Sequence, residues 1–280
     1  SYNLIFFLRN KRRRLPKDSV RHLLFIIFAK SQRPNAINLM NINKVTAVFY
    51  SPTGTSAKIA KTIAMATGLT SYEEIDLTLD RSTHFIPIVE ALTIIAAPVY
   101  SGRVAPVALE RINRLRGNNS PAIIVAVYGN RDYDDALVEL YDTVTSNGFS
   151  VLSAAAFIGE HSYSRHDMPV AEGRPDASDL DLARRFGENS LMKLREKGVT
   201  GHLEIKDNRP YRSPSQRQPV TPVCNGLCMA DGLCIELCPT GAIYFDDENR
   251  IATDAGKCTL CCACVKGCPN NARIFDSPFT

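Results

Sequence analysis

The sequence of 280 residues has no tryptophan, no cysteine before Cys224 and no long apolar run. Runs such as residues 23–29 are far shorter than the roughly 18–20 apolar residues that a membrane-spanning helix needs, which argues against a transmembrane protein. A hydrophobic content of 45%, with 16 glycines and 16 prolines, also excludes disorder throughout the chain and collagen-like architecture. The length suits one or two globular domains.

Acidic residues are scarce at the N-terminus, where residues 1–40 hold nine Lys or Arg and only one acid, Asp18. This tail carries a net charge of +8 and the whole chain +4, which leaves −4 for the remainder. Basicity confined to a tail does not support nucleic-acid binding. Because Met40 directly precedes a strand pattern, we expect residues 1–42 to be a disordered or non-native extension. The alternative is a basic amphipathic anchor on an anionic membrane surface.

All nine cysteines lie between Cys224 and Cys268. Small disulfide-rich modules belong to secreted proteins, but no segment here has the pattern of a signal peptide. Clustered cysteines in a chain that is not secreted more often bind metal. We therefore expect a cytoplasmic protein with a metal-binding C-terminal domain.

Strand and helix patterns alternate between Lys44 and Gly198. Apolar runs predict five strands near residues 45–50, 75–77, 92–97, 122–128 and 151–157. Helical periodicity predicts helices over residues 57–67, 106–115, 134–146 and 176–197, the first of them capped by Ser56. Near-continuous apolar strands with helices between them predict an α/β domain, a five-stranded doubly wound parallel sheet, over residues 43–205. Ligands of such sheets bind beyond the carboxyl ends of the strands.

A proline-rich stretch separates this domain from the cysteines. Its prolines stand at positions 210, 214, 219 and 222, among serine, glutamine and arginine. This composition predicts an extended, semi-rigid linker over residues 206–222. A small cysteine-rich domain over residues 223–280 follows.

The first strand runs directly into a hydroxyl-rich loop that precedes a helix. Its candidate ligand-binding residues are Ser51, Thr53, Gly54, Thr55 and Ser56. Amide groups and the helix dipole favour an anion at a helix N-terminus, and glycine allows close approach, so the loop suits a phosphate monoester. No lysine follows in P-loop spacing and no GxGxxG is present, which disfavours nucleoside triphosphates and dinucleotides. The alternative is an ordinary helix capped by Ser or Thr.

Two further loops follow predicted strands at the same edge of the sheet. The first holds Pro98, Tyr100 and Gly102, and the second holds Tyr128, Gly129, Asn130 and Tyr133. Tyrosine rings in such loops can enclose a planar ligand whose polar edge bonds to the backbone. The alternative is that these tyrosines only cap the sheet.

The segment from Val45 to about Ser164 resembles a flavodoxin domain. The resemblance implies FMN as the cofactor, with its phosphate in the hydroxyl-rich loop. It also implies that Tyr100 and Tyr133 flank the isoalloxazine ring, and that Gly129 and Asn130 lie near its N5 or pyrimidine edge.

The last cysteines match the bacterial ferredoxin motif C-x2-C-x2-C-x3-C-P, with ligands at Cys258, Cys261, Cys264 and Cys268 followed by Pro269. A zinc ribbon would need paired C-x2-C knuckles around one ion and gives no reason for the proline. The spacing therefore favours iron–sulfur clusters over zinc or disulfides.

The first cysteine run is irregular. Counting back from Pro239, the motif expects cysteine at 238, 234, 231 and 228, but position 231 is aspartate. The ferredoxin resemblance assigns Cys258, Cys261, Cys264 and Cys238 to one 4Fe–4S cluster. It assigns Cys228, Cys234 and Cys268 to a second cluster, 4Fe–4S or 3Fe–4S, with Asp231 or Cys224 as the fourth ligand. Cys262 is expected to be a packed or spare thiol.

From about Lys44 to Phe275 the chain resembles the flavodoxin–ferredoxin fusions called EFR family ferrodoxin. The resemblance includes residues 159–164, a third loop over the flavin in which His161 is a proton donor or a structural residue. It implies a flavodoxin-like sheet followed by a small α+β two-cluster ferredoxin domain. The implied function is transfer of single electrons between FMN, two clusters and a redox protein partner. The alternatives are an FMN-dependent reductase of a small organic acceptor and a non-enzymatic redox or iron sensor.

Overall fold

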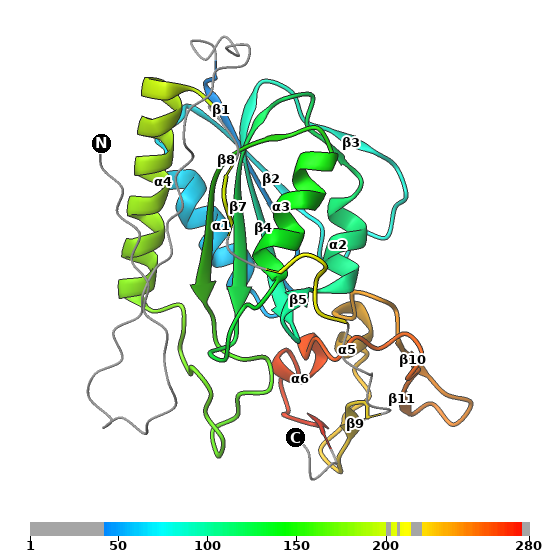
Figure 1. Cartoon of the computed structure of the whole chain (residues 1–280). Helices are drawn as coiled ribbons and strands as arrows, with labels where there is room; N and C mark the ends of the chain where they lie inside the picture. The colour runs from blue at the N-terminus through cyan, green and yellow to red at the C-terminus, as the bar shows by residue number, and fades with distance from the viewer. Residues whose placement is uncertain (1–41, 200–202, 206–207, 214–219, 276–280) are drawn as a thin grey trace.

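The computed structural model describes residues 42–199, 203–205, 208–213 and 220–275. Residues 1–41, and with them the expectation of a disordered or membrane-anchoring extension, lie outside the described residues. Two parts are visible in Figure 1: a large α/β domain, and a small cysteine-rich domain below it.

The large domain is built on a parallel sheet with strand order β2-β1-β4-β7-β8. These strands are β1 (Lys44–Phe49), β2 (Ser71–Asp76), β4 (Ala91–Tyr100), β7 (Pro121–Tyr128) and β8 (Ser150–Ile158). Numbered as five successive strands, this is the order 2-1-3-4-5 of flavodoxin-like folds, and it confirms the expected doubly wound sheet. β5 (Arg103–Val104) pairs antiparallel with the end of β4, and β3 (Ile86–Pro87) pairs with β6 (Leu115–Arg116) away from the main sheet.

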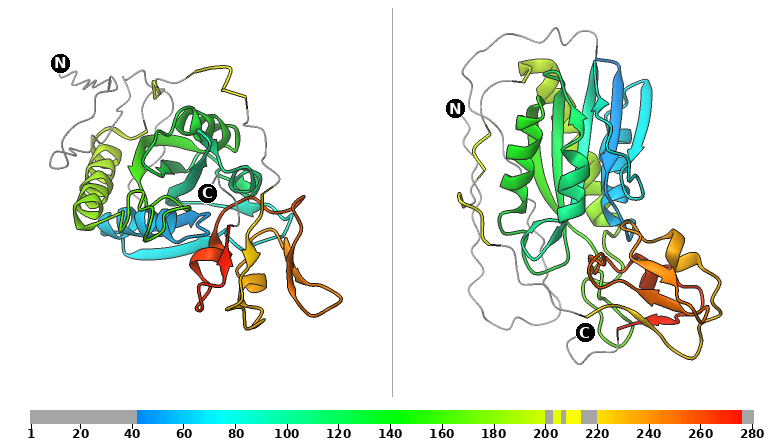
Figure 2. Two further views of the ribbon diagram at one scale, coloured as in Figure 1. Left: turned by 90° about the horizontal axis from the view of Figure 1, so that it is seen from below. Right: turned by 90° about the vertical axis from the view of Figure 1, so that its right-hand side faces the viewer.

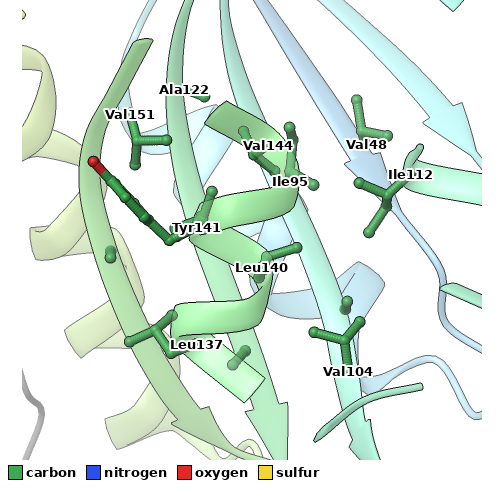
Figure 3. Packing of buried hydrophobic residues seen from close by; sticks show 14 of the residues in the cluster. Val48, Ile95, Val104, Ile112, Ala122, Leu137, Leu140, Tyr141, Val144 and Val151 are labelled. Atoms are coloured by element: carbon green, nitrogen blue, oxygen red, sulfur yellow. The ribbon is translucent and has the colours of Figure 1, made fainter. Parts of the chain in front are cut away.

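Helices cover both faces of the sheet. α1 (Thr55–Ala66) and α4 (Ala177–Lys197) pack on one face, and α2 (Pro106–Ile112) and α3 (Ala136–Ser146) on the other. Figure 3 shows Leu137, Leu140 and Val144 of α3 turned towards the sheet, and all three are fully buried. Burying such a side chain contributes about 1.5–3 kcal/mol, so these faces provide most of the domain's stability.

One strand and two helices begin or end at other residues than the sequence predicts. β2 begins at Ser71, four residues before the predicted run, because it is a polar edge strand with mostly exposed side chains. α1 begins at Thr55, so Ser56 is not the cap; the N-cap is Gly54, which has a left-handed φ of 84°. α2 ends at Ile112, since Leu115 enters β6 instead of continuing the helix.

The small domain consists of short elements arranged as two similar halves. They are β9 (Val223–Cys224), α5 (Leu233–Glu236), β10 (Ile243–Phe245), β11 (Ile251–Thr253), α6 (Ala263–Lys266) and β12 (Arg273–Ile274). β9 pairs with β12 and β10 with β11, both antiparallel. Cys234 lies on α5 and Cys264 at the equivalent place on α6, and both are buried in the core of the domain. This is the α+β arrangement that the sequence predicts.

The small domain lies at the edge of the sheet where the parallel strands end, as Figures 1 and 2 show from three directions. The described part of the predicted linker runs along the large domain. Asn208 and Arg212 donate to the carboxylate of Asp135, and Arg209 pairs with Asp142. These contacts hold residues 208–213 against α3 before the chain enters the small domain.

Candidate cofactor sites

The hydroxyl-rich loop leaves the N-terminus of α1 open. The N-cap residue Gly54 has no side chain to cap this helix, and the amides of a helix's first turn have no acceptor within the helix. A Cβ on Gly54 would meet no atom within 4 Å, so the space beside the loop is free. Ser51 braces the loop: its amide donates to Thr78 Oγ1 at 2.8 Å, and its Oγ accepts from Ala57 N–H at 2.9 Å. Anions bind at such helix ends.

One hydroxyl of this loop is buried without a partner. Ser56 is fully buried, and its Oγ forms no hydrogen bond within the described residues. Buried polar groups are normally paired, so an unpaired hydroxyl beside open helix amides fits a ligand that carries acceptor oxygens. Thr53 and Thr55 lie on either side of Gly54, half-buried.

The two tyrosine loops end at the same edge of the sheet, and their rings lie in different environments. Tyr133 contacts Tyr128, with ring centroids 5.9 Å apart and planes inclined by 60°. Tyr100, by contrast, lies towards the small domain, where burial, the Cys261 thiol and the neighbouring Tyr50 raise its pKa well above the usual value. The structure therefore places Tyr100 and Tyr133 in different environments.

Pro98, Gly102 and Asn130, which the sequence also predicts to bind the ligand, belong to the same two loops as these rings. The carbonyl oxygen of Pro98 accepts from Ala105 N–H, and that of Gly102 from Asp135 N–H, both at 3.0 Å. Asn130 is exposed and has a left-handed φ of 71°.

Gly129 allows close packing of the third loop, because a Cβ there would lie 2.6 Å from His161 Cδ2. His161 Nδ1 accepts a hydrogen bond from Tyr163 N–H at 3.1 Å. Burial and the nearby Lys266 lower the pKa of His161. The imidazole is therefore neutral at neutral pH, with its proton on Nε2.

Polar contacts bind the small domain to these loops. Lys266 Nζ lies 2.6 Å from Glu160 Oε1 and 2.6 Å from the carbonyl oxygen of Ser164. On the other side, Arg81 Nη2 donates to the carbonyl oxygen of Cys238 at 2.7 Å. Sequence reasoning missed both contacts, because their partners are more than 100 residues apart.

Five cysteines line one cavity of the small domain, here called site A: Cys238, Cys258, Cys261, Cys262 and Cys264. Backbone N–H groups point at Cys238 Sγ, with Ala242 N–H at 3.2 Å, and although burial opposes it, these bonds lower the pKa of this thiol. Burial raises the pKa of Cys261 to about 12. Site A thus brings together the four residues that the ferredoxin resemblance assigns to one cluster.

A second cavity, site B, is lined by Cys228, Cys234, Cys268 and Asp231. Ala272 N–H donates to Cys268 Sγ at 3.3 Å, which repeats the arrangement at Cys238 in the other half of the domain. Asp231 Oδ1 accepts from Leu233 N–H at 3.1 Å and is exposed.

Two further cysteines, Cys224 and Cys262, lie outside these two groups of predicted ligands. Cys224 lies beside it, within reach of Cys228, and its Sγ accepts from Arg273 Nη1 at 3.4 Å. Cys262 is only 2% exposed, and its thiol donates to the carbonyl oxygen of Leu260 at 3.5 Å. It packs at the edge of site A and forms no part of site B.

All nine cysteines are free thiols. Within the described ranges, no three His, Cys, Asp or Glu side chains converge closely enough to bind a single metal ion. The thiols are instead spread around two cavities, an arrangement that suits a group larger than one ion. The hydroxyl-rich loop and the two cysteine-lined cavities are therefore the candidate cofactor sites, and the thiols of the cavities suit iron–sulfur binding.

Comparison with known proteins finds similarity to curated iron–sulfur subunits, while no family model matches. The chain is 40% identical over 43 residues to a putative iron–sulfur subunit of dimethyl sulfoxide reductase from Halobacterium salinarum. It is 42% identical over 43 residues to a selenate reductase subunit of Mesobacillus selenatarsenatis, and 40% over 43 residues to the thiosulfate reductase electron transfer subunit PhsB of Salmonella typhi. Each match covers 15% of this chain, and 16%, 15% and 22% of the three relatives respectively.

Solved structures similar to this chain include a flavodoxin from the domain Archaea (12% identity, TM-score 0.35, 55% of this chain and 99% of that one). The flavodoxin of Fusobacterium nucleatum bound to flavin mononucleotide gives 12% identity and a TM-score of 0.35, over 55% of this chain and 98% of that one. The fold assignment itself comes from the strand order. The chain joins a flavodoxin-like domain to a small ferredoxin-like domain. In the described residues no helix is long and apolar enough to cross a membrane.

Proposed function

We propose that this protein transfers single electrons between FMN in the large domain and two iron–sulfur clusters in the small domain, in exchange with a redox protein partner. The observation that carries the proposal is the position of site A against the edge of the sheet. Tyr100 lies at the end of β4 and next to Cys261 of site A. A flavin beside Tyr100 would therefore lie close to a cluster in site A.

Two hydroxyl groups buried between the sheet edge and site A support the binding of a cluster in site A. Tyr50 is fully buried, and its hydroxyl lies near that of Thr259. Thr259 lines site A, and the Cys261 thiol helps to raise the pKa of Tyr50. Buried hydroxyl donors beside these thiols are suited to a cluster whose sulfurs accept hydrogen bonds.

The residues divide between the cofactors as follows. Ser51, Thr53, Gly54, Thr55 and Ser56 would hold the FMN phosphate, and Pro98, Tyr100, Gly102, Tyr128, Gly129, Asn130 and Tyr133 would surround the ring. Site A would bind a 4Fe–4S cluster, and site B a 4Fe–4S or 3Fe–4S cluster with Asp231 or Cys224 as the fourth ligand. FMN can exchange one or two electrons and each cluster one, so the combination can split an electron pair.

The curated relatives agree with a protein partner, because all three are named as subunits of reductases, one of them as an iron–sulfur subunit and another as an electron transfer subunit. The part of this chain that they match spans at most 22% of their length, so the identity of the partner is not transferred. We expect the protein to act in the cytoplasm.

An anaerobic preparation of the full chain tests the proposal directly. Flavin released by denaturation is identified by chromatography, and iron and acid-labile sulfide are counted per chain. We expect one FMN and about seven or eight iron atoms, as two cubane-type clusters require. FAD in place of FMN, or zinc in place of iron, would contradict the proposal.

A further inference from the structure

Arg273 is a buried cation without an acidic partner. Its side chain is on β12 and only 2% exposed. Nη2 donates to the carbonyl oxygen of Pro222 at 2.9 Å and to Thr253 Oγ1 at 2.6 Å. Nε has no hydrogen-bond partner, and no carboxylate pairs with the guanidinium among the residues that the structure describes.

Burying an ion without a counter-ion is costly, and a chain normally avoids it. The groups that lie around this guanidinium are thiols, which become negative as the thiolates that bind a metal. Nη1 donates to Cys224 Sγ at 3.4 Å, Arg273 lines site B beside Cys228 and Cys268, and the Cys264 thiol of site A lies near it. The cation therefore lies between the two sites.

We propose that Arg273 is a counter-cation shared by both clusters, which stabilises their reduced forms and thereby raises their reduction potentials. A cluster bound by thiolates is negatively charged and becomes more so when it accepts an electron. A fixed positive charge in a medium of low dielectric constant stabilises the more negative state more strongly. Charge and hydrogen bonds near the sulfurs are among the factors that set cluster potentials.

This inference rests on the clusters of the proposed function and adds a residue that the sequence motif does not contain. The competing explanation is structural. In that account Arg273 only ties β12 to Pro222 and Thr253, and the charge has no influence on the clusters.

The test is an anaerobic redox titration of the full chain, followed by electron paramagnetic resonance. The variants are Arg273→Gln and Arg273→Lys, and the control is Arg250→Gln. Arg250 belongs to the same domain, but its side chain is 66% exposed and pairs with Asp246 and Glu248. The control therefore removes the same charge from the surface, where solvent screens it.

We expect Arg273→Gln to disfavour reduction of both clusters by at least tenfold, which is about 59 mV for a one-electron couple. Arg273→Lys should stay within about threefold of the wild type and Arg250→Gln within about twofold, because the first keeps the buried charge and the second removes only a screened one. Full iron content with unchanged potentials in Arg273→Gln would overturn the inference. Loss of iron from both Arg273 variants would also overturn the inference, because cluster binding would then depend on the shape of the arginine side chain and not on its charge. A wild type without iron would instead contradict the proposed function.

Discussion

Arg111 of the large domain donates from Nη2 to the carbonyl oxygen of Pro239 in the small domain, at 2.6 Å. Pro239 directly follows Cys238, a residue of site A. The same guanidinium donates to the carbonyl oxygens of Leu77 and Thr78 at the end of β2, and is 6% exposed. One buried side chain thus connects the sheet edge to the backbone beside a predicted cluster ligand.

Replacing Arg111 should therefore destabilise the protein as a whole. Arg111→Met would leave three buried carbonyl groups without a charged donor, and we expect a loss of about 2–4 kcal/mol in the free energy of unfolding. The measurement is denaturant unfolding followed by circular dichroism. Arg185→Met, at a surface position paired with Asp181, should cost less than about 1 kcal/mol. Equal stability of the two variants would show that the contact contributes nothing.

The pair between Glu160 and Lys266 should make the domain contact sensitive to acid. Burial alone would raise the pKa of Glu160, but the hydrogen bonds from Lys266 and from Gly173 N–H outweigh it and lower the pKa below its ordinary value of 4.5. A carboxyl with a lowered pKa stabilises the folded state above its unfolded pKa, and this stabilisation disappears as the pH falls through the folded pKa.

The difference in stability between the wild type and Glu160→Gln should accordingly be constant near neutral pH and shrink below about pH 4.5. Thermal unfolding at a series of pH values measures it. Glu172→Gln is the control, since Glu172 is exposed on the same loop region and should show no such change. A difference that stays constant down to about pH 3 would contradict the prediction.

Loss of a hydroxyl from the phosphate loop should weaken flavin binding. We expect Thr53→Ala to reduce the affinity for FMN by about 1–3 kcal/mol, through loss of a hydrogen bond to a charged acceptor. Titration of the deflavinated protein with FMN, followed by fluorescence quenching, gives the affinity. Thr62→Ala serves as the control, because Thr62 Oγ1 only bonds back to Lys58 within α1. Equal affinities of the two variants for FMN would show that Thr53 does not bind its phosphate.

The fourth ligand of site B can be decided with two variants. Asp231 lines the cavity, while Cys224 lies beside it and bonds to Arg273. Carboxylate is a harder ligand than thiolate and should hold iron less tightly. If Asp231 is the ligand, mild oxidation yields a 3Fe–4S signal, Asp231→Cys abolishes that signal, and Cys224→Ser changes little. If Cys224→Ser destroys the cluster and Asp231→Cys has no effect, the ligand is Cys224.

The sequence was sufficient to predict the sheet and its layers of helices, because buried parallel strands are near-continuous apolar runs. β4 and β7 were recognised for this reason, and only their ends differ from the prediction. β2 was only partly found, since Ser71–Glu74 is polar and exposed at the edge of the sheet. The cysteine motif was informative for a different reason: its spacing is imposed by the size of the group that the thiols surround.

Contacts between the two domains could not be predicted. Arg111 and Pro239 are 128 residues apart in the chain, and no periodicity or motif relates them. The same holds for the proximity of Tyr100 to Cys261, which affects its pKa although the two residues are far apart in the chain. Arg273 has no sequence signal either, because a buried cation becomes apparent only when the thiols around it are located.

Flash photoreduction is the most direct test of electron transfer between the two domains. A laser pulse in the presence of an electron donor reduces the flavin of the full chain, and absorption changes report the subsequent reduction of a cluster. Because Arg81 and Arg111 bind the large domain to the backbone of Cys238 and Pro239 beside site A within one molecule, we predict a transfer rate that does not change with protein concentration. A rate proportional to protein concentration, or a flavin that stays reduced while the clusters stay oxidised, would contradict the account.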